Sequence, residues 1–260
     1  MTDKKIGLAL SGGGARGFAH IGAVKALIEN EIPIDLIAGT SAGSFVGGAL
    51  AAGLSIDEII EVGRKISWFG VAGFSYSPRG LLSNAPMGKF INDNFPVLQF
   101  EELRIPFAAV ACDLETGEEV VLKDEGDLAE AIRASCAIPG VFIPVDSKGR
   151  TLIDGGVVSP MPTHAVREMG ADVVIAVDLL TCGSTYWGRP STLLGMFFQS
   201  AMMMLRTASR NQHYRADIVI EPEIAHIRPD EIAKRDELME LGEKAVLDKI
   251  DEIKTLILQG

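Results

Sequence analysis

The stretch LIAGTSAGSFVGGAL, residues 36–50, decides the fold that we expect for this chain of 260 residues. Its first three residues are strand-like, and its second half is a run of small and apolar residues at helical spacing. Between the two halves, residues 39–43 fit the pattern G-x-S-x-G. A strand, a sharp turn and a helix form the context in which this pattern becomes a nucleophile elbow. Ser41 is therefore a candidate nucleophile, and Gly39 and Gly43 allow the backbone to turn sharply beside it.

The rest of the chain alternates between strand-like and helix-like patterns. Short apolar runs predict strands at residues 6–10, 36–38, 107–112, 120–122, 141–145, 172–177 and 218–220. The run at residues 173–177 is continuously apolar, as expected for a strand that is covered on both faces. The alternation indicates an α/β fold in which helices cover both faces of a mostly parallel sheet.

Helical spacing is clearest after the first strand and at the C-terminus. The first of these helices has apolar residues at Phe18, Ile21, Val24, Leu27 and Ile28. The second is amphipathic, with one apolar stripe made of Val246, Ile250, Ile253 and Ile257. Two segments, residues 67–86 and 181–206, fit the alternation poorly. No repeat or long linker interrupts the chain, so residues 1–260 are predicted to form a single domain.

Composition narrows the class of protein. A formal net charge of −11 argues against nucleic acid as a partner, because phosphate binding needs concentrated Lys and Arg. The three cysteines, Cys112, Cys136 and Cys182, fit no metal-binding pattern and are typical of reduced thiols in the cytosol. The first apolar run is too short for a signal peptide, so we expect a cytoplasmic location. Residues 36–56 carry no charge, but their glycines and serines favour a buried strand, elbow and helix over a membrane span.

A glycine loop, GGGARG at residues 12–17, follows the first strand and opens a helix. It matches G-x-G-x-x-G, the dinucleotide-binding fingerprint. That interpretation requires an acidic residue near the carboxyl end of the second strand. Asp35 stands at the start of that strand and so at the opposite end of the sheet, whereas Ser41 occupies the carboxyl end. A bound nucleotide is therefore the disfavoured alternative.

The other interpretation explains both glycine motifs together. If the first two strands are parallel neighbours, the loops at their carboxyl ends are adjacent, and the amides of Gly12, Gly13 and Gly14 can point at an oxygen above Ser41. The amide of Ala42, next to the nucleophile, is a further donor. Arg16 either binds a substrate phosphate or braces the loop, and we favour bracing.

A base for Ser41 is needed, because a free serine hydroxyl is a poor nucleophile at neutral pH. The histidines are His20, His164, His213 and His226, and for each of them a structural role is favoured. Asp154 is the better candidate, because it follows an apolar run and precedes Gly155 and Gly156, which leave its carboxylate approachable. A plain turn is the alternative interpretation of this tripeptide. A desolvated carboxylate within hydrogen-bonding reach can accept the serine proton directly.

These motifs together resemble the patatin-like phospholipase family. The glycine loop, the G-x-S-x-G motif and the Asp154-Gly155-Gly156 motif occur in the order typical of that family. The stretch SGGGARGFAHIG, residues 11–22, is especially similar to short bacterial members and to the catalytic domain of neuropathy target esterase. Residues 134–140, ASCAIPG, resemble the segment that precedes the acid. The resemblance spans about residues 5–180, and Ser11 departs from the Asp that plant patatins usually carry before the glycines.

The resemblance implies a three-layer α/β/α fold, a dyad of Ser41 and Asp154, and no metal or cofactor. It also implies an oxyanion hole in the glycine loop, to which we assign Gly12, Gly13, Gly14, Arg16, Gly17 and Ala42. Gly39, Gly43, Gly155 and Gly156 are the glycines of the elbow and the acid loop. Residues 181–260 are expected to form a helical C-terminal part of the same domain.

The expected function is hydrolysis of lipid carboxylic esters, phospholipid or lysophospholipid, through an acyl-enzyme. An acyltransferase with the same dyad and a non-catalytic lipid-binding or regulatory protein are the alternatives. The two poorly fitting segments are candidates for the acyl site. Residues 190–205 are uncharged and rich in Met and Phe, so they are a candidate for contact with acyl chains or the inner membrane surface. An ordinary core or dimer-interface helix is the favoured interpretation of this run. The sequence also leaves open whether the chain forms a homo-oligomer.

Overall fold

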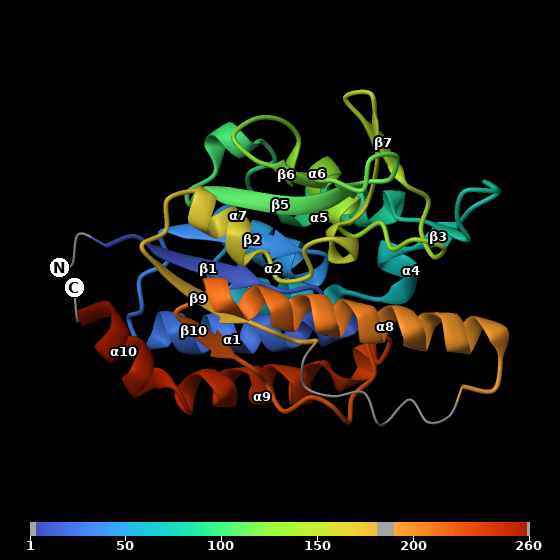
Figure 1. Ribbon diagram of the computed structural model, residues 1–260. Helices are drawn as coiled ribbons and strands as arrows, with labels where there is room; N and C mark the ends of the chain where they lie inside the picture. Colours follow the sequence, from blue (N-terminus) through green and yellow to red (C-terminus); the bar gives the residue numbers. More distant parts are fainter. Residues whose placement is uncertain (1–3, 181–189, 259–260) are drawn as a thin grey trace.

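A central sheet organises the computed structural model, which describes residues 4–180 and 190–258 (Figure 1). Within these residues the main sheet has eight strands in the order β10-β9-β1-β2-β5-β8-β7, and β6 pairs with β5. The strands are β1 (Ile6–Leu10), β2 (Leu36–Thr40), β5 (Phe107–Asp113), β6 (Glu119–Leu122), β7 (Val145–Ser147), β8 (Arg150–Asp154), β9 (Val173–Val177) and β10 (Ile218–Ile220). The five strands from β10 to β5 are parallel, and β6, β7 and β8 pair antiparallel. The predicted α/β fold with a mostly parallel sheet is confirmed.

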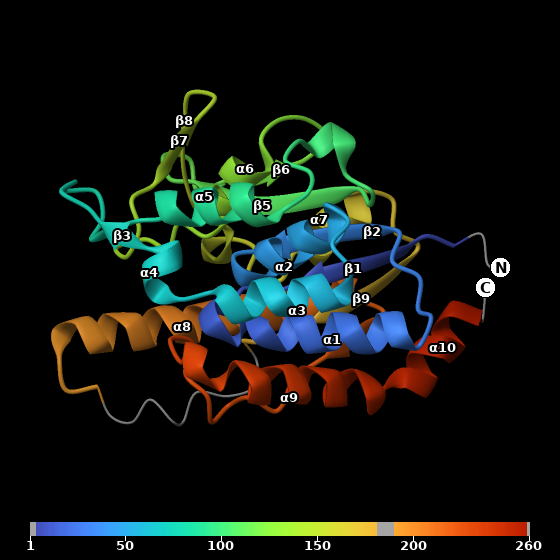
Figure 2. The same ribbon diagram turned by 180° about the vertical axis from the view of Figure 1, so that it is seen from behind.

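Helices lie on both sides of this sheet. Figures 1 and 2 show α1, α3 and α9 on one side and α7 on the other. The helices are α1 (Phe18–Glu29), α2 (Ala42–Ala51), α3 (Ile56–Lys65), α4 (Trp68–Val71), α5 (Ala85–Asn94), α6 (Leu128–Ser135), α7 (Thr163–Glu168), α8 (Leu193–Gln212), α9 (Arg235–Leu247) and α10 (Ile250–Leu258). The expected three layers are therefore present.

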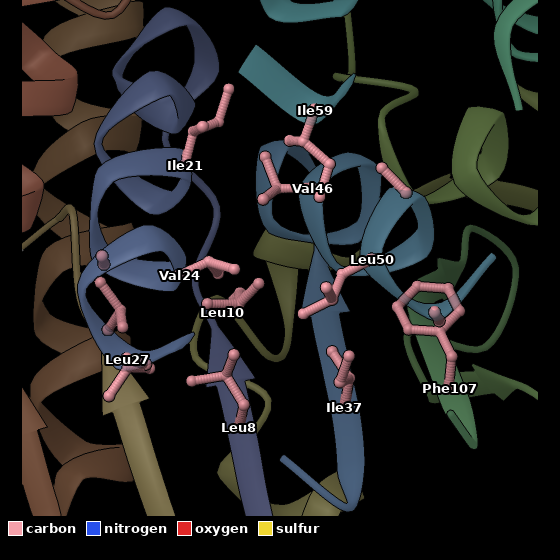
Figure 3. Packing of buried hydrophobic residues seen from close by; sticks show 14 of the residues in the cluster. Leu8, Leu10, Ile21, Val24, Leu27, Ile37, Val46, Leu50, Ile59 and Phe107 are labelled. Atoms are coloured by element: carbon pink, nitrogen blue, oxygen red, sulfur yellow. The ribbon is translucent and has the colours of Figure 1, made fainter. Parts of the chain in front are cut away.

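The larger part of the core lies between the sheet and α1, α2 and α3. Figure 3 shows Leu8, Leu10, Ile37 and Phe107 of the sheet facing apolar side chains of these helices. The opposite face carries a second cluster of mostly small side chains beneath α7. All residues of β1, β2, β5 and β9 are buried, because strands covered on both faces expose neither set of side chains. The interpretation of residues 173–177 as such a strand is confirmed.

The structure corrects three details of the sequence prediction. Residues 141–145 do not form a strand, because Pro144 cannot donate a ladder hydrogen bond, and only Val145 begins one, in the β7–β8 hairpin. The C-terminal stripe is divided between α9 and α10, and Lys249 at the break donates a hydrogen bond of 2.6 Å to the Val219 carbonyl in β10. Ile28 is 38% exposed, since the neighbouring Leu27 takes the position facing the core.

The two segments that fitted the alternation poorly lie at one end of the molecule. The first contains α4 and a two-stranded antiparallel sheet of β3 (Gly73–Phe74) and β4 (Leu82–Ser83). The described part of the second contains the N-terminal half of α8, whereas Cys182 and Trp187 lie outside the described residues. Figures 1 and 2 place α4, β3 and the start of α8 at the end of the molecule away from the chain termini. No helix among the described residues is long and apolar enough to cross a membrane.

Candidate active site

Ser41 occupies a sharp turn between β2 and α2. Its φ of 52° and ψ of −122° place it in a backbone region that non-glycine residues rarely adopt. A Cβ on Gly39 would lie 2.4 Å from the Gly43 carbonyl oxygen, and one on Gly43 would lie 2.1 Å from the carbonyl oxygen of Leu10. Only glycine fits at these two positions. The predicted strand, turn and helix are present, and the tight turn lifts the Ser41 side chain above the carboxyl edge of the sheet.

Asp154 stands beside Ser41, although the two residues are 113 positions apart. The Ser41 hydroxyl donates a hydrogen bond of 2.7 Å to Oδ2 of Asp154, and the Gly156 amide donates one of 2.7 Å to Oδ1. Asp154 is the last residue of β8, paired with Ala111 in β5. A Cβ on Gly155 would lie 2.2 Å from a β5 carbonyl oxygen, so the glycines let the acid loop lie directly against the sheet.

Burial makes the Asp154 carboxylate more basic than an ordinary one. The side chain is 6% exposed, and desolvation raises its pKa from 3.8 to about 6. The hydrogen bonds from Ser41 and Gly156 act in the opposite direction and limit the rise in the pKa. At neutral pH the group is therefore ionised, within reach of the hydroxyl proton, and a stronger base than a solvated aspartate.

The raised pKa of Asp154 predicts that the substitution Asp154→Asn stabilises the folded protein at alkaline pH. An unfolded aspartate has a pKa near 3.9, so ionised Asp154 lowers the free energy of unfolding by about 2 to 3 kcal/mol above pH 6. A neutral amide of the same shape avoids this cost: its oxygen can accept from the Gly156 amide, and its NH2 group can donate to the Ser41 oxygen. Urea unfolding should show the variant more stable by roughly that amount at pH 8, with the gain shrinking as pH falls from 6 to 4. A gain that does not change with pH would contradict the raised pKa.

Ser135 is a component of the site that the sequence analysis did not single out. Its hydroxyl accepts a hydrogen bond of 2.8 Å from the Ser41 amide and donates one of 2.6 Å to the Val110 carbonyl in β5. It thereby fixes the backbone at the strained turn to the neighbouring strand. The only sequence signal was its place in the segment at residues 134–140, which resembles the family's segment ahead of the acid.

The histidines have other partners than the Ser41–Asp154 pair. His20 is fully buried, which lowers its pKa to about 4, and its Nε2 lies 2.8 Å from the Ser11 carbonyl oxygen. His164, His213 and His226 pair with Glu168, Asp178 and Glu237. Within the part of the chain that the structure describes, none of the four hydrogen-bonds to Ser41 or Asp154, as the structural interpretation of these histidines expects.

The glycine loop lies next to Ser41, because β1 and β2 are parallel neighbours with Leu10 opposite Gly39. A Cβ on Gly12 would lie 3.5 Å from that of Ser41, so the loop backbone packs against the nucleophile. The Gly12 amide itself donates to the Pro160 carbonyl. Among the described residues, the amides of Gly13 and Gly14 donate to no backbone carbonyl. The Ala42 amide is at the first turn of α2, where it lacks an intrahelical acceptor.

Arg16 and Gly17 hold the loop in place. The Arg16 guanidinium is buried and donates hydrogen bonds of 2.8 Å to the Ile227 carbonyl and 3.2 Å to the Leu179 carbonyl. This is the bracing role that we favoured over phosphate binding. A Cβ on Gly17 would lie 2.7 Å from the Ala42 Cβ, so its small size brings the loop against α2. The candidate oxyanion donors are thereby narrowed to Gly13, Gly14 and Ala42.

An apolar pocket opens beside Ser41. It runs along α2 from Ala42 to Ala49, a distance of about 10 Å at 1.5 Å per residue. Side chains from α1, α3 and α4 complete its walls, among them Ile21, Val62 and Trp68. Among the described residues, no charged residue lines it, and Ser41 supplies the only hydroxyl. A hydrocarbon chain fits such a pocket, and a phosphate or sugar does not.

The structure gives no support to the nucleotide alternative. Asp35 lies at the amino end of β2 and accepts a hydrogen bond of 2.7 Å from the Ile6 amide, far from the glycine loop. Within the part of the chain that the structure describes, no three His, Cys, Asp or Glu side chains gather in a way that could hold a metal ion.

Comparison with solved structures supports the fold. VipD from Legionella pneumophila superposes with a TM-score of 0.58 at 15% identity, covering 96% of this chain and 67% of that one. The type III effector protein ExoU gives a TM-score of 0.53 at 14% identity, covering 99% of this chain and 54% of that one.

Comparison of sequences identifies the family. The chain is 40% identical over 181 residues to an uncharacterized NTE family protein of Mycobacterium tuberculosis, covering 68% of this chain and half the length of that protein. It is 35% identical over 189 residues to human patatin-like phospholipase domain-containing protein 6, covering 69% of this chain and 14% of that protein. The family model described as patatin-like phospholipase matches residues 8–167. The chain therefore belongs to the patatin-like phospholipase family.

Proposed function

We propose that this protein is a serine acyl hydrolase that cleaves carboxylic esters of lipids, with phospholipids or lysophospholipids as the substrate class. The observation that carries the proposal is the hydrogen bond of 2.7 Å between the Ser41 hydroxyl and the buried Asp154 carboxylate, beside a pocket without charged lining residues. A nucleophile paired with a base is the arrangement that acyl transfer needs. Family membership supports the same reaction class.

The reaction proceeds in two halves. Asp154 accepts the hydroxyl proton as the Ser41 oxygen attacks the ester carbonyl, and the carbonyl oxygen becomes an oxyanion that the amides of Gly13, Gly14 and Ala42 stabilise. The intermediate collapses to an acyl-enzyme, and Asp154 returns the proton to the departing alcohol. A water molecule then gives its proton to Asp154 and attacks the acyl carbonyl, which releases the fatty acid and regenerates the Ser41 hydroxyl.

The shape of the pocket supports binding of the acyl chain in the channel along α2. Phe45, Val46 and Ala49 follow Ser41 along this helix and line the pocket on one side. An apolar chain that enters there removes apolar surface from water, which stabilises the bound ester by about 0.8 kcal/mol per methylene group. The alcohol part of the substrate then extends toward the pocket mouth.

The substitution Ala49→Leu is expected to shorten the preferred acyl chain. Ala49 lies at the far end of the channel, and a larger side chain there occupies space that the chain terminus needs. We expect kcat/KM for a long-chain p-nitrophenyl ester to fall about tenfold or more, and that for the acetate to change less than threefold. The acetate is the internal control for folding and for the dyad. An equal loss on all chain lengths would place the acyl chain elsewhere.

A further inference from the structure

We propose that two segments beside the active site form a surface that docks on a phospholipid bilayer. This inference rests on the proposed function, since it names where the enzyme meets its substrate. The surface, here called the apolar rim, consists of exposed residues in α4, in and just after β3, and in α8: Phe69, Phe74, Tyr76, Leu193, Phe197 and Met204.

The apolar rim consists of large side chains with little cover. Phe69 is 89% exposed, Phe74 is 88% exposed and Leu193 is 84% exposed. Folded soluble proteins rarely leave several such side chains in water at one end of the molecule. Figures 1 and 2 show that α4, β3 and the first half of α8 extend past the same end of the sheet. More than 100 residues separate α8 from α4 and β3 in the sequence.

The rim continues into the acyl pocket. Trp68, next to Phe69, lines the pocket. Its indole N–H donates a hydrogen bond of 3.2 Å to the carbonyl of Asp230, two residues before Ile232, which also lines the pocket. Phe142 also lines the pocket and forms a β-bridge with Leu82 in β4. An acyl chain leaving a bilayer at the rim would therefore meet apolar surface on its way to Ser41.

α8 is fixed at one end and extends at the other. Near its C-terminus, Ser209 and His213 each place a polar atom 2.6 Å from Oδ2 of the buried Asp178, which follows β9. Farther toward the N-terminus, Leu205 packs over the acid loop, 3.4 Å from where a Cβ on Gly156 would lie. The anchored half thus lies against the site, and the free half presents Phe197 outward.

The charge of the chain around the apolar rim fits a lipid surface. Residues 62–92, which include α4 and β3, and residues 190–216, which include α8, contain Lys and Arg but no Asp or Glu. The whole chain has 35 acidic residues and a net charge of −11. Lys89 and Arg210 are exposed, and neither forms an ion pair among the described residues. A bilayer containing anionic lipid repels acidic surfaces and attracts basic ones. Aromatic side chains also favour the headgroup region of a bilayer.

The test is vesicle flotation with the Ser41→Ala background, so that vesicles stay intact. Vesicles of phosphatidylcholine and phosphatidylglycerol should carry the protein, and Phe69→Ser with Phe74→Ser, or Phe197→Gln with Met204→Gln, should weaken binding about tenfold or more. Matched controls are Leu247→Gln and Leu258→Gln on exposed sites of α9 and α10, which should bind like the parent. Equal binding by rim and control variants would overturn the proposal.

Activity on a soluble ester separates this proposal from the proposed function. With Ser41 present, the rim variants should hydrolyse p-nitrophenyl acetate at the wild-type rate and lose activity only on vesicles. Vesicle binding without any ester hydrolysis would contradict the enzymatic proposal and leave the docking surface standing. If the rim variants instead convert a dimer to a monomer in light scattering and bind vesicles unchanged, the rim is an interface between copies and the proposal fails.

Discussion

Replacing Ser41 with alanine is expected to lower kcat for ester hydrolysis by about 10⁴-fold or more, because the proposed nucleophile of the acyl-enzyme is then missing. Of the described residues, Ser41 alone brings a hydroxyl to the pocket, and this hydroxyl donates to the Asp154 carboxylate. Removing it leaves the oxyanion donors in place, so a small residual rate over water is expected. The same substitution should abolish covalent labelling by a fluorophosphonate probe, which intact-protein mass spectrometry reads directly.

The labelling experiment has a matched control in Ser191, an exposed serine before α8. The substitution Ser191→Ala should keep the single adduct at the wild-type rate. A folded Ser41→Ala protein that still acquires the adduct would show that another residue is the nucleophile. Wild-type protein that folds and takes no adduct would mean that Ser41 is not activated, and the non-catalytic alternative would then be favoured.

Replacing Asp154 with asparagine is expected to lower kcat/KM by about 10²–10⁴-fold, the usual contribution of a general base. The amide keeps the shape of the side chain and can accept from the Gly156 amide, but its NH2 group donates to the Ser41 oxygen and cannot accept the hydroxyl proton. Unlike the loss of Ser41, this change should slow probe labelling without abolishing it. The result separates a failure of proton transfer from a failure to fold, because this variant is expected to be more stable than wild type at pH 8.

The dependence of kcat/KM on pH is a second test of the predicted role of Asp154 as the base. Burial raises the pKa of Asp154 to about 6, and only the ionised form accepts a proton. Wild-type kcat/KM should therefore rise with pH, level off above about 6, and be about tenfold below its plateau at pH 5. The Asp154→Asn variant should lack this limb, while Asp124→Asn, at an exposed site, should keep it. A limb that survives in Asp154→Asn would assign the titration to another group.

The sequence alone predicted the parts of the site that depend on local chemistry. Gly39 and Gly43 flank a serine between a strand and a small-residue helix, and the structure shows that no Cβ fits at either position. The continuous apolar run at residues 173–177 predicted a strand buried on both faces, which β9 is. These features follow from backbone sterics and hydrophobic periodicity, which act over a few residues.

The tertiary structure decided what depends on contacts between distant segments. Nothing near Ser135 in the sequence indicates that its hydroxyl holds the Ser41 amide, because that contact joins α6 to the elbow across 94 positions. The packing also distinguishes the amides of the glycine loop. The Gly12 amide donates to the Pro160 carbonyl, whereas the amides of Gly13 and Gly14 have no backbone acceptor among the described residues. The raised pKa of Asp154 likewise arises from burial, which only the assembled core produces. Local pattern thus identified the candidate reacting groups, and long-range packing set their geometry and basicity.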